Sequence, residues 1–206
     1  MSSASSALSD ALRAVLLDPA EATSLEVHGR TKAAVLVALY EGSAGGRPSG
    51  LHVVFTRRRH DMRSHAGEIS FPGGRRDEGE DLPTTALREA EEEIGLARDG
   101  VQILGALTPT PTVATNYGVY PFVALIEPGR QWTLSANEVE EVLELRLTDL
   151  RAACTRRRLL HRGIPFRSDV FDVSEQAVIW GATARIVGDL LARIDPLLRH
   201  DGEMPG

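Results

Sequence analysis

The chain has 206 residues, of which 42% are hydrophobic, and its formal net charge is −6 at pH 7. This length and apolar content predict one domain with a full core, and the acidic balance argues against a general nucleic-acid-binding protein. A single cysteine, Cys154, excludes an internal disulfide. No hydrophobic run is long enough to span a bilayer, and the Ser/Ala-rich start lacks a signal-peptide core. We therefore expect a cytoplasmic protein that binds neither nucleic acid nor membrane.

Periodicity predicts a helix and then two strands at the start of the chain. Residues 9–17 place apolar side chains on one side of an amphipathic helix, within a helical extension assigned to residues 1–30. Residues 32–40 and 51–57 have the apolar composition of strands, and the Gly/Ser/Pro-rich segment 41–50 between them is typical of a loop.

A helix is predicted between Leu82 and Ile94. Asp81 or the loop before it can cap the first turn, Pro83 suits a first-turn position, and Gly95 suits the position just past the end. Apolar residues recur at helical spacing and would face the core; they are Ala86, Leu87, Ala90 and Ile94.

Three glutamates of this helix share one side. Glu89, Glu92 and Glu93 stand at positions i, i+3 and i+4, where like charges repel each other and cost stability. A solvated acidic face is the ordinary explanation of such a run, but alternating charges would suit that purpose better. Converging carboxylates suit a hard divalent cation, which prefers oxygen ligands and leaves room for water and a substrate phosphate. We therefore interpret the three glutamates as metal ligands.

Residues before and within this helix can complete such a site. Gly73 and Gly74 allow the backbone to approach a ligand closely, and the carbonyl of Gly74 could join the metal shell. Glu80 is expected to brace the loop. Arg88 can pair with a neighbouring carboxylate and hold it in place; the alternative is an exposed helix arginine.

Residues 74–96 match the Nudix box, G-x5-E-x7-R-E-U-x-E-E-x-G-U with U apolar, at every specified position. The chain thus resembles the Nudix hydrolases, which use Mg²⁺ or Mn²⁺ to cleave a nucleoside diphosphate linked to another group. The resemblance implies an α/β/α sandwich around a mixed sheet, with the box as a loop–helix–loop, in a single domain over residues 1–206. It also implies that Glu89, Glu92 and Glu93 bind the metal and that one of them activates the attacking water. Arg88 would orient the catalytic glutamate.

The segment just before the box is rich in arginine. Residues 54–74 resemble the signature of the coenzyme A diphosphatase branch, which reads apolar-apolar-Thr-x-Arg, then Leu-Arg, then Phe-Pro-Gly-Gly; here Met62 replaces the leucine. Coenzyme A carries a diphosphate and a separate 3′-phosphate, and arginine suits bidentate phosphate contacts. The expected substrate-binding residues are Arg57, Arg58, Arg59 and Arg63. The alternative is that some of these arginines only balance nearby acids or lie on a solvated loop.

Beyond the box, three more strands and a C-terminal helix are predicted. Residues 101–107, 119–126 and 143–147 have strand composition, and residues 108–118 form a long loop suited to a substrate rim. Residues 174–195 begin with a capping serine and carry apolar side chains at helical spacing, so we assign a helix that packs on the sheet.

The acidic segment 137–142 precedes the last of these strands. In the resembled family, an acidic residue of this region can supply a further metal ligand or the base, and Glu138 is the candidate here. The spacing departs from the branch, because Asn137 and Glu138 are adjacent where the branch has Asn-x-x-Glu-Val. A solvated helical turn is the alternative.

The resemblance implies metal-dependent hydrolysis of the diphosphate bond of coenzyme A or an acyl derivative, giving 3′,5′-ADP and a 4′-phosphopantetheine product. The cofactor would be Mg²⁺ or Mn²⁺, and the partner would be a small-molecule substrate. The sequence does not decide between a monomer and a homodimer. One alternative is a Nudix enzyme for another nucleoside diphosphate such as ADP-ribose. Another is a non-catalytic nucleotide sensor, against which the intact Glu89, Glu92 and Glu93 argue.

Overall fold

The computed structural model describes residues 3–29, 31–42, 49–61, 67–112, 116–161 and 164–200. The helices in this part of the chain are α1 (Ser3–Val15), α2 (Pro19–Ser24), α3 (Leu82–Ile94), α4 (Leu147–Ala152) and α5 (Gly181–His200), with a 3-10 turn at Arg98–Gly100. The strands are β1 (Thr31–Gly42), β2 (Gly50–Arg58), β3 (Ile69–Ser70), β4 (Gly73–Arg75), β5 (Gln102–Ala106), β6 (Thr110–Pro111), β7 (Tyr117–Leu125), β8 (Val139–Arg146), β9 (Cys154–His161), β10 (Ile164–Ser174) and β11 (Ala177–Ile179).

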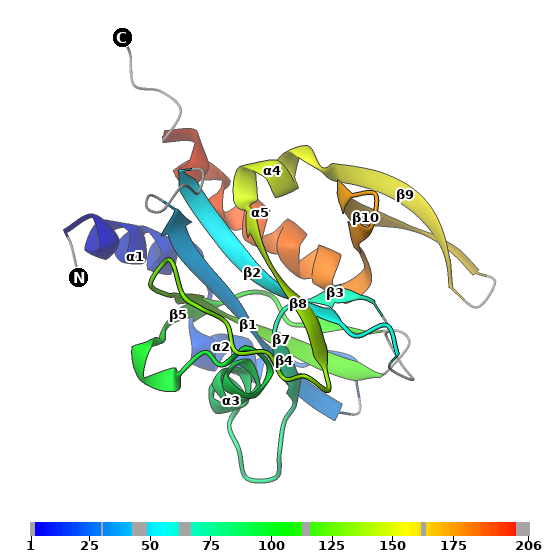
Figure 1. The fold of residues 1–206 in the computed structure, drawn as a ribbon, viewed down its shortest axis with the longest axis horizontal. Helices are drawn as coiled ribbons and strands as arrows, with labels where there is room; N and C mark the ends of the chain where they lie inside the picture. Colours follow the sequence, from blue (N-terminus) through cyan, green and yellow to red (C-terminus); the bar gives the residue numbers. More distant parts are fainter. Residues whose placement is uncertain are drawn as a thin grey trace.

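The larger sheet is mixed and lies between helices. β3, β2, β1, β7 and β5 are neighbours in that order, while β8 pairs with β2, β4 with β1 and β6 with β7. β1 runs parallel to β7 but antiparallel to β2 and β4. Helix α3 packs on one face of this sheet and α5 on the other (Figure 1). The predicted α/β/α sandwich is therefore confirmed.

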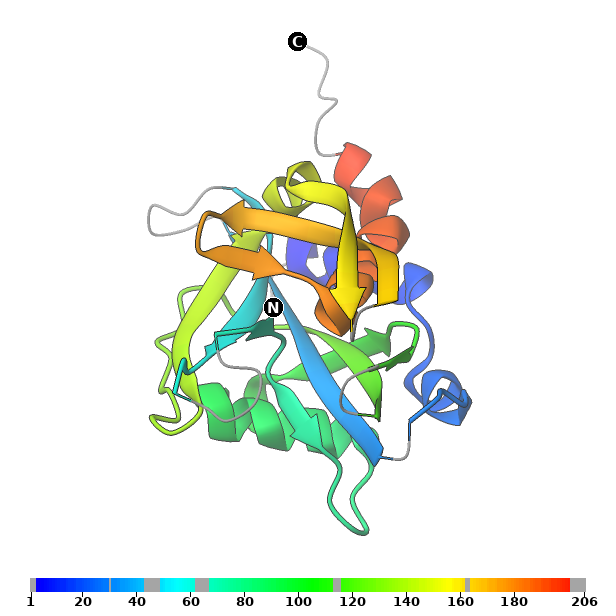
Figure 2. The ribbon, with the colours of Figure 1, turned by 90° about the vertical axis from the view of Figure 1, so that its right-hand side faces the viewer.

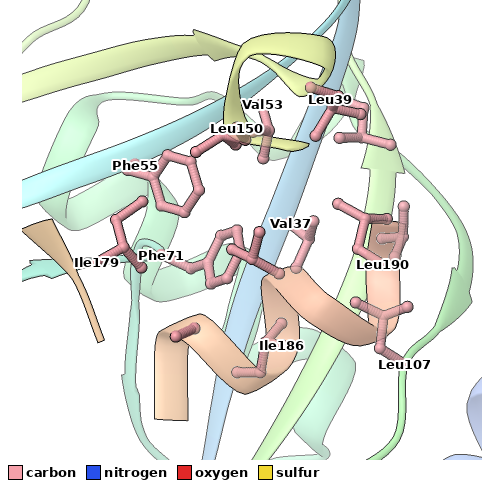
Figure 3. Close-up of a cluster of buried hydrophobic side chains, with 14 of the residues drawn as sticks. Val37, Leu39, Val53, Phe55, Phe71, Leu107, Leu150, Ile179, Ile186 and Leu190 are labelled. Carbon is pink, nitrogen blue, oxygen red and sulfur yellow. The ribbon is translucent and has the colours of Figure 1, made fainter. Parts of the chain in front are cut away.

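The sheet is covered on both faces because its central strands are apolar on both sides. Successive side chains of a strand point to opposite faces, so Leu36 of β1 joins the cluster under α3 and Val37 joins the cluster under α5. Figure 3 shows the second cluster, in which Ile186 and Leu190 extend from α5. A strand buried on both faces reads as a continuous apolar run, as residues 33–39 do.

The C-terminal part of the chain forms a second, three-stranded sheet. β9 and β10 form an antiparallel hairpin, and β11 pairs with the other edge of β10. Figure 2 looks onto this hairpin in front of α5. β11 lies next to β3 and so joins the small sheet to the large one.

The predicted helix over residues 174–195 begins too early. Ser174 ends β10, and its hydroxyl accepts a hydrogen bond from the Gln176 backbone N–H within a turn (3.3 Å). Val178 and Ile179 then lie in β11, opposite Asp172 and Phe171. Helix α5 starts only at Gly181, after a residue whose large side chain is exposed. The apolar residues before that point fitted the helical spacing, but they are buried as a strand.

Other element boundaries shift by a few residues. Helix α1 covers Ser3–Val15 rather than 9–17, and β8 begins at Val139, four residues before the predicted strand. Within the predicted loop 108–118, Thr110 and Pro111 pair with β7, and residues 113–115 lie outside the described part. Among the described residues, no helix is long and apolar enough to cross a membrane.

Candidate active site

Helix α3 has the bounds predicted from the sequence. The Asp81 side chain accepts a hydrogen bond from the Thr84 backbone N–H (2.7 Å), which caps the first turn. Gly95 ends the helix with φ +70°, a left-handed conformation that favours glycine. Ala86 and Ala90 are fully buried under the sheet. The caps and the apolar stripe together fix which side of α3 carries the glutamates.

Two of the three glutamates point at the glycines of β4. The Gly73 backbone N–H donates to Glu93 Oε2 (3.3 Å). A Cβ atom on Gly74 would lie 2.5 Å from the Glu89 carboxylate, so only glycine leaves room for that side chain. β4 is held against β1 by antiparallel pairing, Gly74 opposite Ala34. The sheet therefore determines where both carboxylates lie.

Arg88 joins the loop to the helix through several carboxylates. Its Nε donates to Glu80 Oε1 (3.0 Å), and its Nη1 donates to Glu89 Oε1 (2.8 Å) and Glu92 Oε2 (3.2 Å). Glu80 also accepts from the Thr85 hydroxyl (2.7 Å), and these hydrogen bonds, that of Arg88 first, lower the pKa of Glu80. Glu80 therefore braces the loop, as predicted, and Arg88 restrains the glutamates rather than standing free in solvent.

Burial makes the two inner carboxylates costly to ionise. Desolvation raises the pKa of Glu93 to about 8, although the Gly73 N–H and the Arg58 charge oppose the rise. Desolvation also raises the pKa of Glu89, against the opposing hydrogen bond from Arg88. Charged carboxylates in such surroundings need a compensating positive charge. This donor set suits a hard divalent cation, which prefers oxygen ligands.

Glu92 has a different environment from its neighbours. Its side chain is 58% exposed and reaches Arg88. No three His, Cys, Asp or Glu side chains in the described part of the chain form a group that could hold a metal ion as they stand. A cation here would therefore draw on water or substrate oxygens as well, as is usual for Mg²⁺.

Glu138 is exposed and lies in a turn that follows Ser135, whose backbone N–H donates to the Glu93 carbonyl at the end of α3 (2.9 Å). Its negative charge raises the pKa of both Glu89 and Glu93, which places it within electrostatic reach of each. The turn is closed by the Glu138 backbone N–H, which donates to the Ser135 carbonyl (3.0 Å). The structure thus shows an exposed turn, as the alternative explanation had it, which is tied to the end of α3 through Ser135.

Two of the predicted phosphate-binding arginines are engaged by other groups. Arg57 Nε donates to Glu141 Oε2 (2.9 Å), and its Nη1 donates to the Gln176 carbonyl (2.9 Å). Arg59 forms a two-bond pair with Asp61, at 2.9 Å and 2.7 Å. These contacts match the alternative that some of the arginines balance nearby acids.

Of the three described arginines, Arg57, Arg58 and Arg59, only Arg58 points toward the glutamates. Its Nη1 lies 3.9 Å from Glu93 Oε1, and its buried Nε has no hydrogen-bond partner in the described part of the structure. Neighbouring residues of a strand face opposite sides of the sheet, which separates Arg58 from Arg57. Arg63 lies outside the described residues.

Reasoning from the sequence missed the contacts between α3 and the loop that precedes β8. The Ser135 backbone N–H donates to the Glu93 carbonyl (2.9 Å), and the Thr133 N–H donates to the Ile94 carbonyl (3.1 Å). Residues 135–138 read Ser-Ala-Asn-Glu, a spacing typical of a capped helical turn, and this was the available signal. The contacts of this loop with α3 join residues far apart in the sequence, so no local sequence pattern indicates them.

The hollows of the structure do not single out the glutamates of α3. One hollow of about 310 Å³ is lined by Arg59, His60, Asp61 and Glu140 and by none of those glutamates. A hollow of about 260 Å³ lies between α4 and strands β2 and β8, lined by His52, Arg146 and Leu150 among others. It is at the opposite end of β2 from Arg58, and none of the glutamates discussed above lines it. The clustered carboxylates therefore locate the candidate active site better than the volume of a hollow.

Comparison with known proteins identifies the family. The NUDIX domain model matches residues 30–168. The chain is 36% identical over 145 residues to the uncharacterized Nudix hydrolase NudL of Photorhabdus laumondii, covering 69% of this chain and 76% of that protein. It is 32% identical over 180 residues to the protein of the same name from Escherichia coli, covering 82% and 85%.

Solved structures agree with this assignment at the level of the fold. A MutT/nudix family protein from Enterococcus faecalis aligns with a TM-score of 0.51 and 16% identity, covering 84% of this chain and 64% of the other. The Nudix hydrolase RenU from M. Smegmatis aligns with a TM-score of 0.50 and 17% identity, covering 66% and 81%.

The chain therefore belongs to the Nudix hydrolase family. Enzymes of this family act on pyrophosphate bonds, in derivatives of nucleoside diphosphates, and generally use divalent metal ions. The carboxylates of α3 and the glycines of β4 lie within the matched region.

Proposed function

We propose that the protein hydrolyses the diphosphate bond of coenzyme A or its acyl derivatives, giving 3′,5′-ADP and (acyl-)4′-phosphopantetheine. The observation that carries the proposal is Arg58, which lies 3.9 Å from Glu93 and comes from the segment that resembles the coenzyme A branch. Its Nε, which has no hydrogen-bond partner among the described residues, is a donor that a phosphate oxygen would satisfy. The proposed setting is the cytoplasm, with a small molecule as the partner.

The residues proposed to hold Mg²⁺ or Mn²⁺ are Glu89, Glu92, Glu93, the Gly74 carbonyl and Glu138. When bound, such a cation neutralises diphosphate charge and lowers the pKa of a bound water. The burial of Glu89 and Glu93 supports this assignment, because desolvation raises the pKa of both carboxyls and a bound cation would offset that cost.

The protein's own groups would position the reacting atoms. Arg88 donates hydrogen bonds to Glu89, Glu92 and the loop residue Glu80. These bonds hold the two helix glutamates in a fixed position relative to the loop, so less reorganisation is needed when substrate binds. Arg58 would hold a non-bridging oxygen of the diphosphate beside the glutamates. A carboxylate of the group Glu89, Glu92 and Glu93 would take the proton from the attacking water.

A substrate panel at one Mg²⁺ concentration tests the proposal. Coenzyme A, an acyl-coenzyme A, ADP-ribose and a dinucleoside polyphosphate are incubated with the protein, and the products are identified by mass. We expect coenzyme A or its acyl derivative to be cleaved best. Cleavage of ADP-ribose without cleavage of coenzyme A would refute the coenzyme A assignment and leave the family assignment intact. No cleavage of any substrate would favour a nucleotide sensor.

A further inference from the structure

The turn that carries Glu138 is held between two elements. On one side, the Ser135 backbone N–H donates to the Glu93 carbonyl at 2.9 Å, at the last turn of α3. On the other side, the backbone N–H of Arg59, just after β2, donates to the Glu138 carbonyl at 3.1 Å. The first contact ties the turn to a residue that carries a proposed metal ligand, and the second ties it to the arginine cluster.

The Arg59 side chain forms a further hydrogen bond with the same turn. Its Nη1 donates to the Ala136 carbonyl at 2.9 Å, while its Nε and Nη2 donate to the two oxygens of Asp61 at 2.9 Å and 2.7 Å. A guanidinium has five N–H donors in a fixed planar arrangement, so these three bonds set its orientation. The hydrogen bonds to Asp61, and then its charge, raise the pKa of Arg59, and the same hydrogen bonds lower the pKa of Asp61.

We propose that Arg59 is a positioning residue, which holds the turn at residues 136–138 beside the end of α3 so that the Glu138 carboxylate can reach a cation held by Glu89 and Glu93. This inference rests on the proposed metal-dependent function, because it gives Arg59 a role only if Glu138 serves the metal. Arg59 then acts through Glu138 and not by touching substrate. This differs from the phosphate-binding role that the sequence suggested for it.

Mn²⁺ binding measured without turnover tests the inference. Free Mn²⁺ is followed by electron paramagnetic resonance in titrations of the parent, Arg59→Met, Glu138→Gln and the double variant. Methionine keeps most of the length of the arginine side chain but removes every donor. Loss of a group that orients a metal ligand lowers metal affinity roughly 10-fold to 100-fold, and we expect about a 10-fold loss for Arg59→Met.

The double variant distinguishes positioning from an independent contact. If Arg59 acts through Glu138, the double variant should bind Mn²⁺ no more weakly than Glu138→Gln alone, because coupled residues are not additive. Additive losses, or an unchanged affinity in Arg59→Met, would overturn the inference and leave the proposed function standing. If the parent itself does not bind Mn²⁺, the proposed metal site fails, and the inference fails with it.

Arg146 supplies a matched control. It forms the same kind of two-bond pair with Asp149, and it lies at the other end of the ladder between β2 and β8, opposite His52. Arg146→Met should therefore leave the Mn²⁺ affinity within about two-fold of the parent, as expected of an exposed pair far from the site. An equal loss in both variants would show a general effect of removing a surface arginine and would refute the positioning role.

Discussion

At the scale of single residues, neighbours on one helix have very different surroundings. Glu93 is buried against Gly73 and its pKa is raised to about 8, whereas Glu92, one position earlier, is mostly exposed and pairs with Arg88. Residues one position apart on a helix point about 100° apart, so one can face the sheet while the other faces solvent. The identical side chains therefore have different environments, set by their orientation on the helix.

Glu92→Gln should reduce turnover by at least about 10²-fold with the fold intact, because it removes a charge from the proposed metal site without changing the side-chain shape. Steady-state kinetics with the best substrate of the panel measures the loss. Glu91→Gln is the control, since Glu91 is the preceding residue and pairs with Arg98 (2.7 Å) away from the site. Turnover of Glu92→Gln within a few-fold of the parent would remove Glu92 from the site.

Arg58→Met should reduce the use of coenzyme A and of dephospho-coenzyme A equally, by about 10²-fold in kcat/KM. Arg58 lies beside Glu93, where the diphosphate is proposed to bind, and both substrates share that diphosphate. A much larger loss with coenzyme A would instead assign Arg58 to the 3′-phosphate. No loss with either substrate would show that Arg58 makes no contact with phosphate.

Metal-free protein should lose stability as the pH rises from about 4.5 to about 8. The Glu93 carboxyl has a pKa near its ordinary value of 4.5 when unfolded but about 8 when folded, so the folded state binds more protons between these values. Stability falls with pH wherever the folded state holds more protons, and each unit of pKa difference corresponds to about 1.4 kcal/mol. The expected loss across the range is a few kcal/mol.

Urea unfolding in the presence of EDTA, at about pH 5 and about pH 8, measures this loss in the free energy of unfolding. Glu93→Gln cannot ionise at this position, so its stability should fall less over the same range. A parent protein with equal stability at both pH values would show that Glu93 is ionised in the folded state without a metal.

At the scale of secondary structure, the site depends on the close approach of β4 to α3. The paired strand β4 brings two glycines to the helix, and a side chain on Gly74 would occupy the space of the Glu89 carboxylate. The caps of α3 were evident in the sequence, since Asp81 and Gly95 are local signals. The approach of β4 is a tertiary contact, and the sequence showed only that glycines stand there.

Gly74→Ala should reduce turnover at least about 10-fold and lower the free energy of unfolding by about 1–3 kcal/mol, because the new methyl group meets the Glu89 carboxylate. Gly188→Ala is the matched control: apart from the backbone of α5 itself, no atom of the described residues lies within 4 Å of its would-be Cβ, and alanine favours helix. It should leave turnover unchanged and keep or raise stability. Equal turnover in both variants would contradict the close approach at Gly74.

At the scale of the whole molecule, the two faces of the sheet have different tasks. On the α3 side, β4 of the sheet meets the carboxylates of Glu89 and Glu93, and on the α5 side the sheet packs on an apolar cluster (Figure 3). Because the sheet separates the two clusters, a change on the α5 face should affect stability without disturbing the carboxylates. The loop contacts of α5, such as Asp189 with the Thr108 backbone N–H (2.8 Å), lie on the same side as that cluster.

Leu190→Ala should cost about 2–5 kcal/mol of stability, because Leu190 is fully buried and the smaller residue leaves a cavity. The kcat/KM of the folded fraction should stay within about two-fold of the parent, since α3 lies across the sheet. Leu25→Ala, at an exposed position, should change stability by less than about 0.5 kcal/mol. A large loss of kcat/KM in folded Leu190→Ala would show that the two faces are coupled.

The sequence by itself determined the family, the bounds of α3 and the cluster of candidate metal ligands. These features are local: a cap, an apolar spacing and a spacing of glutamates are all read within a few turns of one segment. The same local reasoning placed the start of α5 too early, because a short apolar run fits both a helix and a buried strand.

Only the tertiary structure decided how the candidate residues divide their tasks. Arg57, Arg58 and Arg59 look equivalent in the sequence, but each has a different environment. Arg57 contacts β8 and the turn between β10 and β11, Arg58 lies near Glu93 of α3, and Arg59 contacts the turn before β8. Strand alternation is local, whereas the groups that a side chain meets come from segments far away along the chain. For that reason the sequence indicated the chemistry of the site, and the packing of the sheet against α3 selected the residues that face it.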